Sequence, residues 1–389
     1  MTHRKSACAL EEILNTDAGL RSLLEHSIEK AQIANPDPQK NPVHNLEEYY
    51  LYLDWTDQPL PWKGLSFAKS STLPETIDQA MAYFFFLLDQ PLDELRECGY
   101  FYPSLQYHPL LVPWVKDVFR DWGRNLSSAE SWSEEYYREI CSEPAFKMEK
   151  GWYELPENWH SFNDFFSRKL SSPSVRPVAF PEDDSVVVSP ADAEFQGIWD
   201  IDERSFIKAK KGIAVKSGTF RSIRQILGPD SAYSDAFAGG KMTHAFLSLT
   251  DYHRYHFPVS GTVKEIRVLP GCDAAGGIMQ WDRKNRRYNL ELGEPEWQSV
   301  ETRGCVIVET EKYGLAAAVP IAMCQVSSVN FSARVRVGDK VRKGDELGHF
   351  LFGGSDFMLI FQKQAGFSYT VDPAYPHVLT GRMCGKMED

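Results

Sequence analysis

Two segments far apart in the chain carry residues that can do chemistry together. Near the C-terminus, Gly353-Gly354-Ser355 lies between two apolar runs, and residues 251–256 upstream read DYHRYH. A serine that follows two glycines is beside an unshielded carbonyl, and glycine permits the strained backbone that an intramolecular attack needs. Serine becomes a nucleophile when a base takes its proton, and histidine titrates near neutral pH without help. The two segments therefore predict attack of Ser355 on the Gly354 carbonyl, assisted by a histidine.

Each segment alone also has a simpler interpretation. Gly-Gly-Ser between strands is commonly a turn, and a His-x-x-His sequence such as His253 and His256 is often a hydrogen-bonded structural pair. A two-histidine zinc site is the next alternative. The sequence offers no third ligand with metal spacing, so we predict no metal site.

Together, the segments resemble the phosphatidylserine decarboxylase family of self-processing, pyruvoyl-dependent decarboxylases. Residues 251–263 resemble the family's DYHxxHxPVxGxV box, and Gly354-Ser355 resembles its C-terminal GS(T/S) step. The likeness continues through Ser161–Leu170 and Arg176–Val178, and Ser189–Asp192 resembles the (S/L)P(A/C)DG box. These motifs occur in the family's order and span residues 160 to 365.

The resemblance implies a proenzyme that makes its own cofactor. Ser355 would attack the Gly354 carbonyl to form an ester, and β-elimination would leave dehydroalanine at residue 355. Hydrolysis would convert this to a pyruvoyl group, giving a β chain of residues 1–354 and an α chain of residues 355–389. The pyruvoyl ketone would form a Schiff base with a substrate amine and accept the electrons released by loss of CO₂.

The resemblance also implies roles for individual residues. His256 is expected to be the base for Ser355, and Asp192 is expected to fix the tautomer of His256, as the aspartate of a serine-protease triad does. His253 is expected to deliver a proton during decarboxylation or to orient the substrate carboxylate.

At two positions the chain departs from the family pattern. Asp192 is followed by Ala193-Glu194 where the family box continues with glycine, and Glu194 is an alternative acid near Asp192. Asp356 follows Ser355 where the family commonly has threonine or serine. A carboxylate there would accept a hydrogen bond from the Ser355 hydroxyl or repel the oxyanion formed during cleavage, so we expect slower processing.

The substrate is an amino-acid moiety, and the sequence leaves two classes open. Phe119–Ser128 and Gly151–Tyr153 resemble the extended soluble branch that includes fungal L-tryptophan decarboxylases, which favours a free, aromatic L-amino acid. Phosphatidylserine is the alternative. A basic and aromatic cluster, Trp281–Tyr288, supports this alternative if it contacts a lipid headgroup. The cluster would otherwise be an ordinary solvated loop, and lysines 208, 210 and 211 have the same two interpretations.

Composition restricts the partners and the compartment. A net charge of −12 disfavours nucleic acid as a partner. No segment is apolar for long enough to insert stably in a membrane, and the first residues lack a signal-peptide core. Seven cysteines without a Cys-x-x-Cys pair fit a reducing compartment, so we expect a cytoplasmic protein. Members of the family often self-associate, which makes a homo-oligomer a further expectation of the resemblance.

The pattern of apolar residues predicts an α+β fold. Leu20, Leu23, Leu24 and Ile28 recur at helical spacing. So do Val115, Val118, Phe119 and Trp122, and we expect that helix to end at Gly123 as its C-cap. Ser131 begins a capping box for the next helix. Short β-rich runs follow at 186–188, 262–268, 306–308, 316–319 and 357–361. We therefore expect a helical domain over 1–155 and a β-rich catalytic domain with barrel-sandwich-like elements over 156–389.

One segment of the β-rich region favours a different class of protein. Val335–Gly348 resembles the hammerhead of barrel-sandwich folds such as lipoyl domains, which would make the chain a non-catalytic binding module. Carrier domains place a modifiable lysine in a Met-Lys-like pair on an exposed hairpin, and this hairpin offers none. A carrier also has no use for the DYHRYH segment, so the enzyme is the preferred interpretation.

Overall fold

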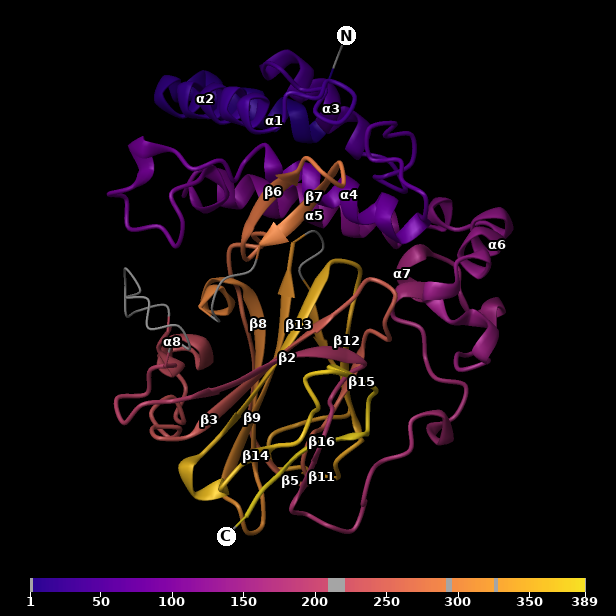
Figure 1. Cartoon of the computed structure of the whole chain (residues 1–389), viewed down its shortest axis with the longest axis vertical. Helices are drawn as coiled ribbons and strands as arrows, with labels where there is room; N and C mark the ends of the chain where they lie inside the picture. The colour runs from indigo at the N-terminus through magenta and orange to yellow at the C-terminus, as the bar shows by residue number, and fades with distance from the viewer. Residues whose placement is uncertain (1–2, 209–220, 292–295, 325–327, 389) are drawn as a thin grey trace.

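The computed structural model describes residues 3–208, 221–291, 296–324 and 328–388. The chain forms a helical part, which contains the N-terminus, and a β part, which contains the C-terminus, at opposite ends of the molecule (Figure 1). The α-helices are α1 (Lys5–Thr16), α2 (Ala18–Ala34), α3 (Leu46–Thr56), α4 (Leu73–Phe86), α5 (Leu111–Leu126), α6 (Glu134–Ser142), α7 (Phe162–Phe166) and α8 (Ile223–Leu227). Among the described residues, no helix combines the length and the apolarity that a bilayer crossing requires.

The helical periodicity of the sequence is confirmed, but two helix boundaries differ from the prediction. Helix α5 continues through Gly123 and ends at Leu126. The Leu126 side chain is fully buried, and its burial stabilises the extra turn. The cap of α6 is Ser133, whose hydroxyl accepts the N–H of Tyr136, rather than Ser131. The Ser131 hydroxyl instead donates to the carbonyl of Leu126, the last residue of α5, and to that of Ser128 just beyond it, because that helix extends toward Ser131.

The β part is built on an antiparallel sheet with the strand order β11-β5-β8-β9-β13-β3-β2-β15. Its strands are β2 (Ala193–Asp200), β3 (Lys241–Leu247), β5 (Gly261–Leu269), β8 (Thr302–Glu309), β9 (Leu315–Met323), β11 (Lys340–Val341), β13 (Gly354–Phe361) and β15 (His377–Val378). Strand β13 lies inside the sheet between β9 and β3, and Ser355 pairs with Leu247 on one side and Ala322 on the other. The predicted cleavage site is therefore the first step of a central strand.

Three smaller sheets complete the β part. In the first, β16 (Met383–Lys386) lies between β1 (Val186–Val188) and β14 (Ser368–Tyr369). In the second, β12 (Glu346–Phe350) lies between β10 (Val329–Phe331) and β4 (Arg254–His256), and the third pairs β6 (Ile278–Asp282) with β7 (Arg287–Glu291). The pairing of β4 with β12 matters most for function. It brings the DYHRYH segment beside the chain that leads into Ser355, and the carbonyl of His253 accepts the N–H of Phe350 at 2.9 Å.

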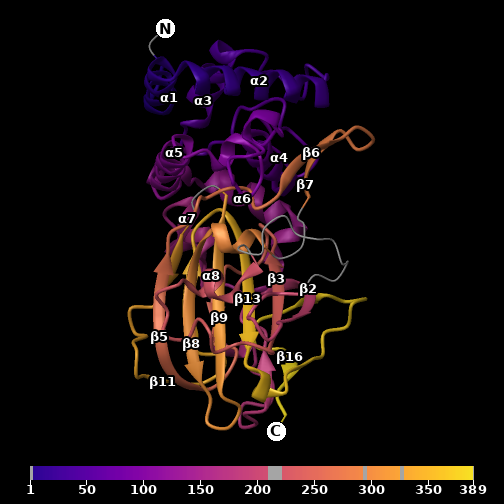
Figure 2. The same cartoon turned by 90° about the vertical axis from the view of Figure 1, so that its left-hand side faces the viewer.

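The β6–β7 hairpin leaves the β part and lies against α4 (Figure 2). The Gln79 amide of α4 holds it there, donating to the Tyr288 carbonyl at 2.9 Å and accepting the Tyr288 N–H at 2.7 Å. The predicted cluster Trp281–Tyr288 is thereby divided. Tyr288 is buried against the helices, whereas Arg286 is exposed and pairs with Asp37.

The predicted fold class is confirmed, since a helical N-terminal region precedes antiparallel sheets, and the five predicted β-rich runs all lie in strands. The domain boundary at residue 155 stays a prediction, and the first strand begins later, at Val186. Residues 335–348 contain β11 and the start of β12, joined by a turn. Of the three lysines considered for headgroup contact, Lys210 and Lys211 lie outside the described residues.

Candidate active site

Ser355 and His253 are in direct contact inside the protein. Both side chains are fully buried, and the Nδ1 atom of His253 lies 3.1 Å from the Ser355 hydroxyl oxygen. The other ring nitrogen, Nε2, lies 3.1 Å from the Ser248 carbonyl oxygen. Because a carbonyl oxygen only accepts, Nε2 carries the proton and Nδ1 presents a lone pair to the serine hydroxyl. This is the tautomer that a base for Ser355 requires.

The surroundings of His253 keep its ring neutral. Burial, aided by the positive charge of Arg168, lowers the pKa of His253 to about 3. The Phe166 ring stacks on the imidazole with 3.8 Å between ring centroids. At neutral pH the ring can therefore accept a proton, and once protonated it is a strong acid that readily gives the proton up.

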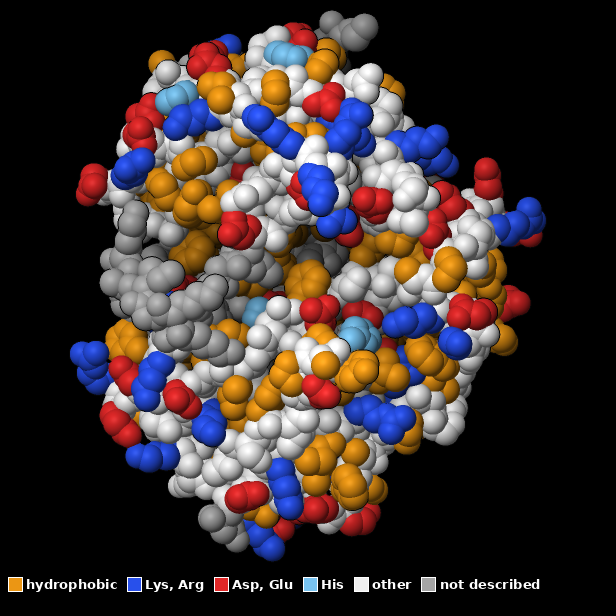
Figure 3. Space-filling view, viewed as in Figure 1, with side chains coloured by type: hydrophobic (Ala, Val, Ile, Leu, Met, Phe, Trp, Pro, Cys, Tyr) orange, Lys and Arg blue, Asp and Glu red, His pale blue; other side chains and the backbone are white. Residues whose placement is uncertain are grey.

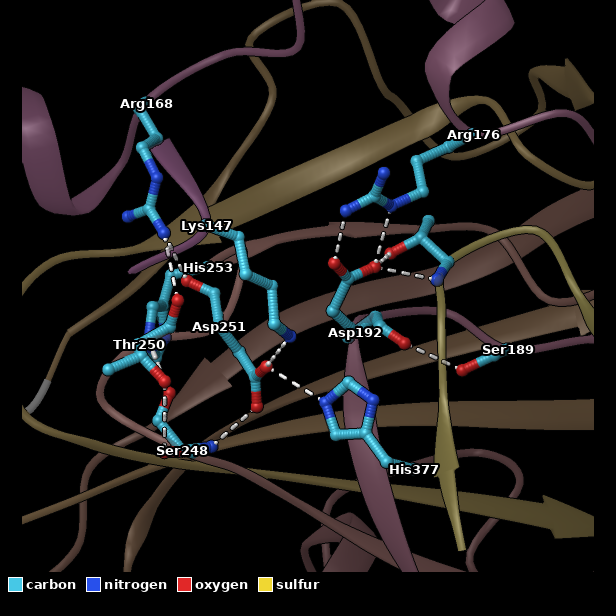
Figure 4. Close-up of polar contacts among 12 residues, drawn as sticks. Lys147, Arg168, Arg176, Ser189, Asp192, Ser248, Thr250, Asp251, His253 and His377 are labelled. Carbon is cyan, nitrogen blue, oxygen red and sulfur yellow. Dashed lines mark hydrogen bonds and ion pairs between the residues drawn. The ribbon is translucent and has the colours of Figure 1, made fainter. Parts of the chain in front are cut away.

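Helix α7 and the residues around it position both partners. The guanidinium of Arg168 is fully buried and donates to the carbonyls of Thr250 and Asp251 at 3.0 and 2.9 Å, which holds the turn before His253 (Figure 4). On the other side, the amide oxygen of Asn163 accepts the N–H of Phe352 at 3.0 Å. The segment that resembles the family at residues 161–170 thus supports the histidine and the cleavage step together.

His256 has different partners. Its Nδ1 lies 2.8 Å from the Gly344 carbonyl oxygen, and its Nε2 lies 3.3 Å from the Tyr252 hydroxyl. Burial lowers the pKa of His256 as well. The structure therefore brings His253, rather than His256, to Ser355, which differs from the predicted pairing. Among the described residues, the two histidines do not share a partner.

Asp192 forms a buried ion pair with Arg176 instead of a hydrogen bond to His256. Arg176 donates to both carboxylate oxygens, at 3.0 and 2.6 Å, and Thr380 donates from its N–H at 2.8 Å and its hydroxyl at 2.9 Å (Figure 4). Burial opposes ionisation, but the hydrogen bonds and charge of Arg176 hold the pKa of Asp192 below its usual range. The negative charge of Asp192 partly opposes the lowering of the pKa of His253 and His256, so Asp192 acts on both histidines from a distance.

Asp251 shapes the turn between β3 and β4. One carboxylate oxygen accepts the Ser248 N–H at 2.9 Å, and the other lies 2.8 Å from Nε2 of His377 (Figure 4). The hydrogen bond to Asp251 raises the pKa of His377. Lys147 lies 3.9 Å from the same carboxylate.

The two departures from the family pattern lie away from the Ser355 hydroxyl. Successive side chains of a strand point to opposite faces of the sheet, so Asp356 points away from Ser355. The Asp356 carboxylate is fully buried and hydrogen-bonded to Nε2 of His244, and burial raises its pKa. Glu194 is exposed on β2. Neither carboxylate makes a hydrogen bond to Ser355 among the described residues.

Sequence reasoning missed several supporting residues. Arg168 and Arg176 lie inside segments that resemble the family, but isolated arginines carry no signal of burial or of their partner. Lys147 and His377 lie in segments with no motif, and only the folded chain brings them to Asp251. The role of the Asn163 amide could not be predicted either, because its partner, the N–H of Phe352, is brought to it only by the folding of the chain.

Known proteins resemble the chain over the same region. The family model for phosphatidylserine decarboxylase matches residues 162–385. Phosphatidylserine decarboxylase proenzyme 2 of Oryza sativa subsp. japonica is 35% identical over 211 residues, 54% of this chain but only 30% of the relative. Decarboxylase iboD of Amanita muscaria is 29% identical over 285 residues, 66% of this chain and 79% of the relative.

A bacterial relative covers a similar part of the chain. The phosphatidylserine decarboxylase proenzyme of Fusobacterium nucleatum is 31% identical over 248 residues, 62% of this chain and 73% of the relative. The matched residues 162–385 include the Ser355–His253 contact, the Asp192–Arg176 pair and the arginine that holds the turn before His253. The chain belongs to the phosphatidylserine decarboxylase family and is therefore a pyruvoyl-dependent decarboxylase, whose cofactor arises by self-cleavage of a proenzyme.

Proposed function

We propose that the chain cleaves itself between Gly354 and Ser355 and then decarboxylates a free, aromatic L-amino acid. The observation that carries the cleavage site is the 3.1 Å contact between the Ser355 hydroxyl and Nδ1 of His253 at the start of β13. The hydroxyl is buried beside a base, and Gly354 supplies a carbonyl without a shielding side chain.

The cleavage step balances without an external reagent other than water. The Ser355 oxygen bonds to the Gly354 carbonyl carbon, the peptide C–N bond breaks, and an ester forms. Removal of the α-proton of residue 355 expels the Gly354 carboxylate and leaves dehydroalanine. Water then replaces the nitrogen as ammonia, so the chain from residue 355 onward begins with a pyruvoyl group.

The residues around position 355 fit that group. Its ketone supplies the electron sink for the loss of CO₂. His253 is the neutral base beside it, and its low pKa, about 3, makes the protonated ring a strong donor. We therefore assign His253 to proton transfer during decarboxylation. It would give a proton to carbon after CO₂ has left.

Two histidines compete for the role of base during cleavage. The geometry favours His253, which contacts Ser355, whereas the family resemblance assigns this role to His256 with Asp192. If His253 is the base, His253→Ala stays full length. If His256 is the base, His256→Ala stays full length, whereas His253→Ala is cleaved. In that case the His256 ring must move to Ser355 before cleavage.

The substrate assignment rests on the helical part of the chain. The segments Phe119–Ser128 and Gly151–Tyr153 resemble the branch that acts on free tryptophan, and they lie outside the region that matches the family model. Phosphatidylserine is the second candidate, because relatives of the chain carry that name. Release of CO₂ from L-tryptophan in buffer supports the first candidate. Release only from phosphatidylserine vesicles, with no turnover of free amino acids, overturns it in favour of the lipid.

A further inference from the structure

A cavity of about 320 Å³ lies where α4 and the β6–β7 hairpin meet the β part. Gly353, Met323 and Leu247 form one of its walls. Met323 pairs with Gly354 and Leu247 pairs with Ser355 across the sheet, so this wall is next to the proposed cleavage site. The face of the molecule in Figure 3 is hollowed between the helical part and the β part. The cavity has the size of a small-molecule site.

The opposite wall is one face of α4. Asp78, Met81 and Ala82 are spaced three and four residues apart and share that face. The Gln79 amide fixes this wall by its two hydrogen bonds to the backbone of Tyr288 on the hairpin. The cavity is thus formed by the folded chain itself, between two elements that are already tied together.

Asp78 introduces a carboxylate into a largely apolar cavity. Its side chain lines the cavity and is open to solvent, and none of the described residues donates a hydrogen bond to it or forms an ion pair with it. Desolvation, with a smaller contribution from Glu75, raises the pKa of Asp78 to about 7. Arg287 also lines the cavity, but it is exposed and makes no ion pair with Asp78.

We propose that this cavity holds the side chain of the substrate and that Asp78 selects an aromatic ring bearing a neutral N–H donor, such as indole. The inference rests on the proposed function, because it takes the substrate to be a free amino acid. The amine and α-carbon would face residue 355, and the ring would extend between Met323 and α4 toward Asp78. Asp78 is thereby a specificity-determining residue, without a part in the bond-breaking steps.

The chemistry of the cavity disfavours the other substrate classes. A phosphodiester would bring its negative charge toward two carboxylates, Asp78 and Glu75, against the single positive charge of Arg287, so the cavity repels it on balance. A side-chain ammonium would lose its hydration in a cavity lined by Met81, Ala82 and Met323. An indole ring buries its apolar faces and loses one hydrogen bond to water, which Asp78 replaces.

The test compares L-tryptophan with 3-(benzothiophen-3-yl)-L-alanine, in which sulfur replaces the N–H with little change in shape. We expect kcat/KM of the wild type to favour tryptophan by about 10- to 100-fold, the usual range for one buried hydrogen bond. Asp78→Ala should reduce this preference to within about threefold. Alanine has a high helix propensity, so this change should not disturb α4. Asp78→Asn should keep part of it, because its amide oxygen still accepts.

Complete self-cleavage of each variant verifies that it has folded, and Asp117→Asn, an exposed change on α5, is the matched control. An unchanged tryptophan preference in Asp78→Ala overturns the role of Asp78 while the proposed function stands. A wild type that prefers L-lysine to tryptophan overturns both the role of Asp78 and the aromatic substrate of the proposed function. A wild type that acts on phosphatidylserine vesicles and on no free amino acid overturns the proposed function itself.

Discussion

Asp356 offers a sharp test, because sequence and structure lead to opposite expectations for it. From the sequence, a carboxylate next to Ser355 should slow cleavage by repelling the oxyanion. In the structure, Asp356 points to the other face of β13 and is hydrogen-bonded to His244. Asp356→Ser restores a residue that the family commonly has there. We expect it to leave the rate of self-cleavage nearly unchanged and to lower stability instead.

The magnitudes separate the two cases. At the effective dielectric constant of about 20 that suits protein sites, a carboxylate about 4 Å from an oxyanion repels it by about 4 kcal/mol, which corresponds to roughly a thousandfold in rate. Removing such a group would therefore speed cleavage by orders of magnitude. The structure instead predicts a change below about threefold, or about 0.7 kcal/mol. Loss of the carboxylate leaves the buried His244 ring without that partner, which costs about 1–3 kcal/mol of unfolding free energy.

The assay follows the loss of full-length chain with time after synthesis in a cell-free system, alongside urea unfolding of the purified protein. Asp356→Asn is the companion variant, since it keeps the shape and removes the charge. Cleavage of either variant at least tenfold faster than the wild type would refute the placement of Asp356. Unchanged stability in Asp356→Ser would show that its bond to His244 contributes little.

Three further changes have expected outcomes. His253→Ala should reduce decarboxylation at least a hundredfold, the scale of a lost proton-transfer group, either because the cleaved chain turns over slowly or because the chain stays full length without its pyruvoyl group, so CO₂ release is measured together with the cleaved fraction. Arg176→Met leaves Asp192 buried without its charge partner and should lower the unfolding free energy by about 3–5 kcal/mol in urea. Asp251 raises the pKa of His377, so this pair stabilises the fold fully below the unfolded pKa of histidine, and the stabilisation is lost as pH rises through the folded pKa. His377→Asn should therefore flatten the dependence of Tm on pH above the unfolded pKa of histidine, about 6.5.

A specific result would contradict each of these three expectations. Normal turnover by cleaved His253→Ala would remove that residue from the reaction. For the ion pair, Arg120→Met on the exposed face of α5 is the control, and an equal loss of stability in both arginine variants would mean that burial of the pair is unimportant. A Tm profile of His377→Asn with the wild-type slope would assign the pH dependence to other groups.

Much of the fold was accessible from the sequence, because its signals are local. Apolar residues at helical spacing predicted α2 and α5, and β-rich runs bounded by glycine or proline predicted strands such as β5 and β13. The ends of helices were less accessible. Gly123 looked like a cap, but the burial of Leu126 extends α5 past it, and this is a tertiary effect.

For the site, the sequence allowed us to predict which residues take part but not how they contact one another. Ser355, His253, His256 and Asp192 carry the motifs, yet their partners depend on strand pairing, which the motifs do not encode. The pairing of β4 with β12 decides which histidine lies beside Ser355, and the strand alternation of β13 turns Asp356 away. Buried partners such as Arg176 become visible only when segments distant in sequence meet.

The most direct test of self-cleavage is the intact mass of the freshly purified protein. We predict two chains, of which the smaller begins at residue 355 and is one ammonia lighter than simple hydrolysis of the Gly354–Ser355 bond would leave. That mass would establish both the position of cleavage and the pyruvoyl group. A single chain of 389 residues, or a break at any other peptide bond, would contradict the assignment of Ser355.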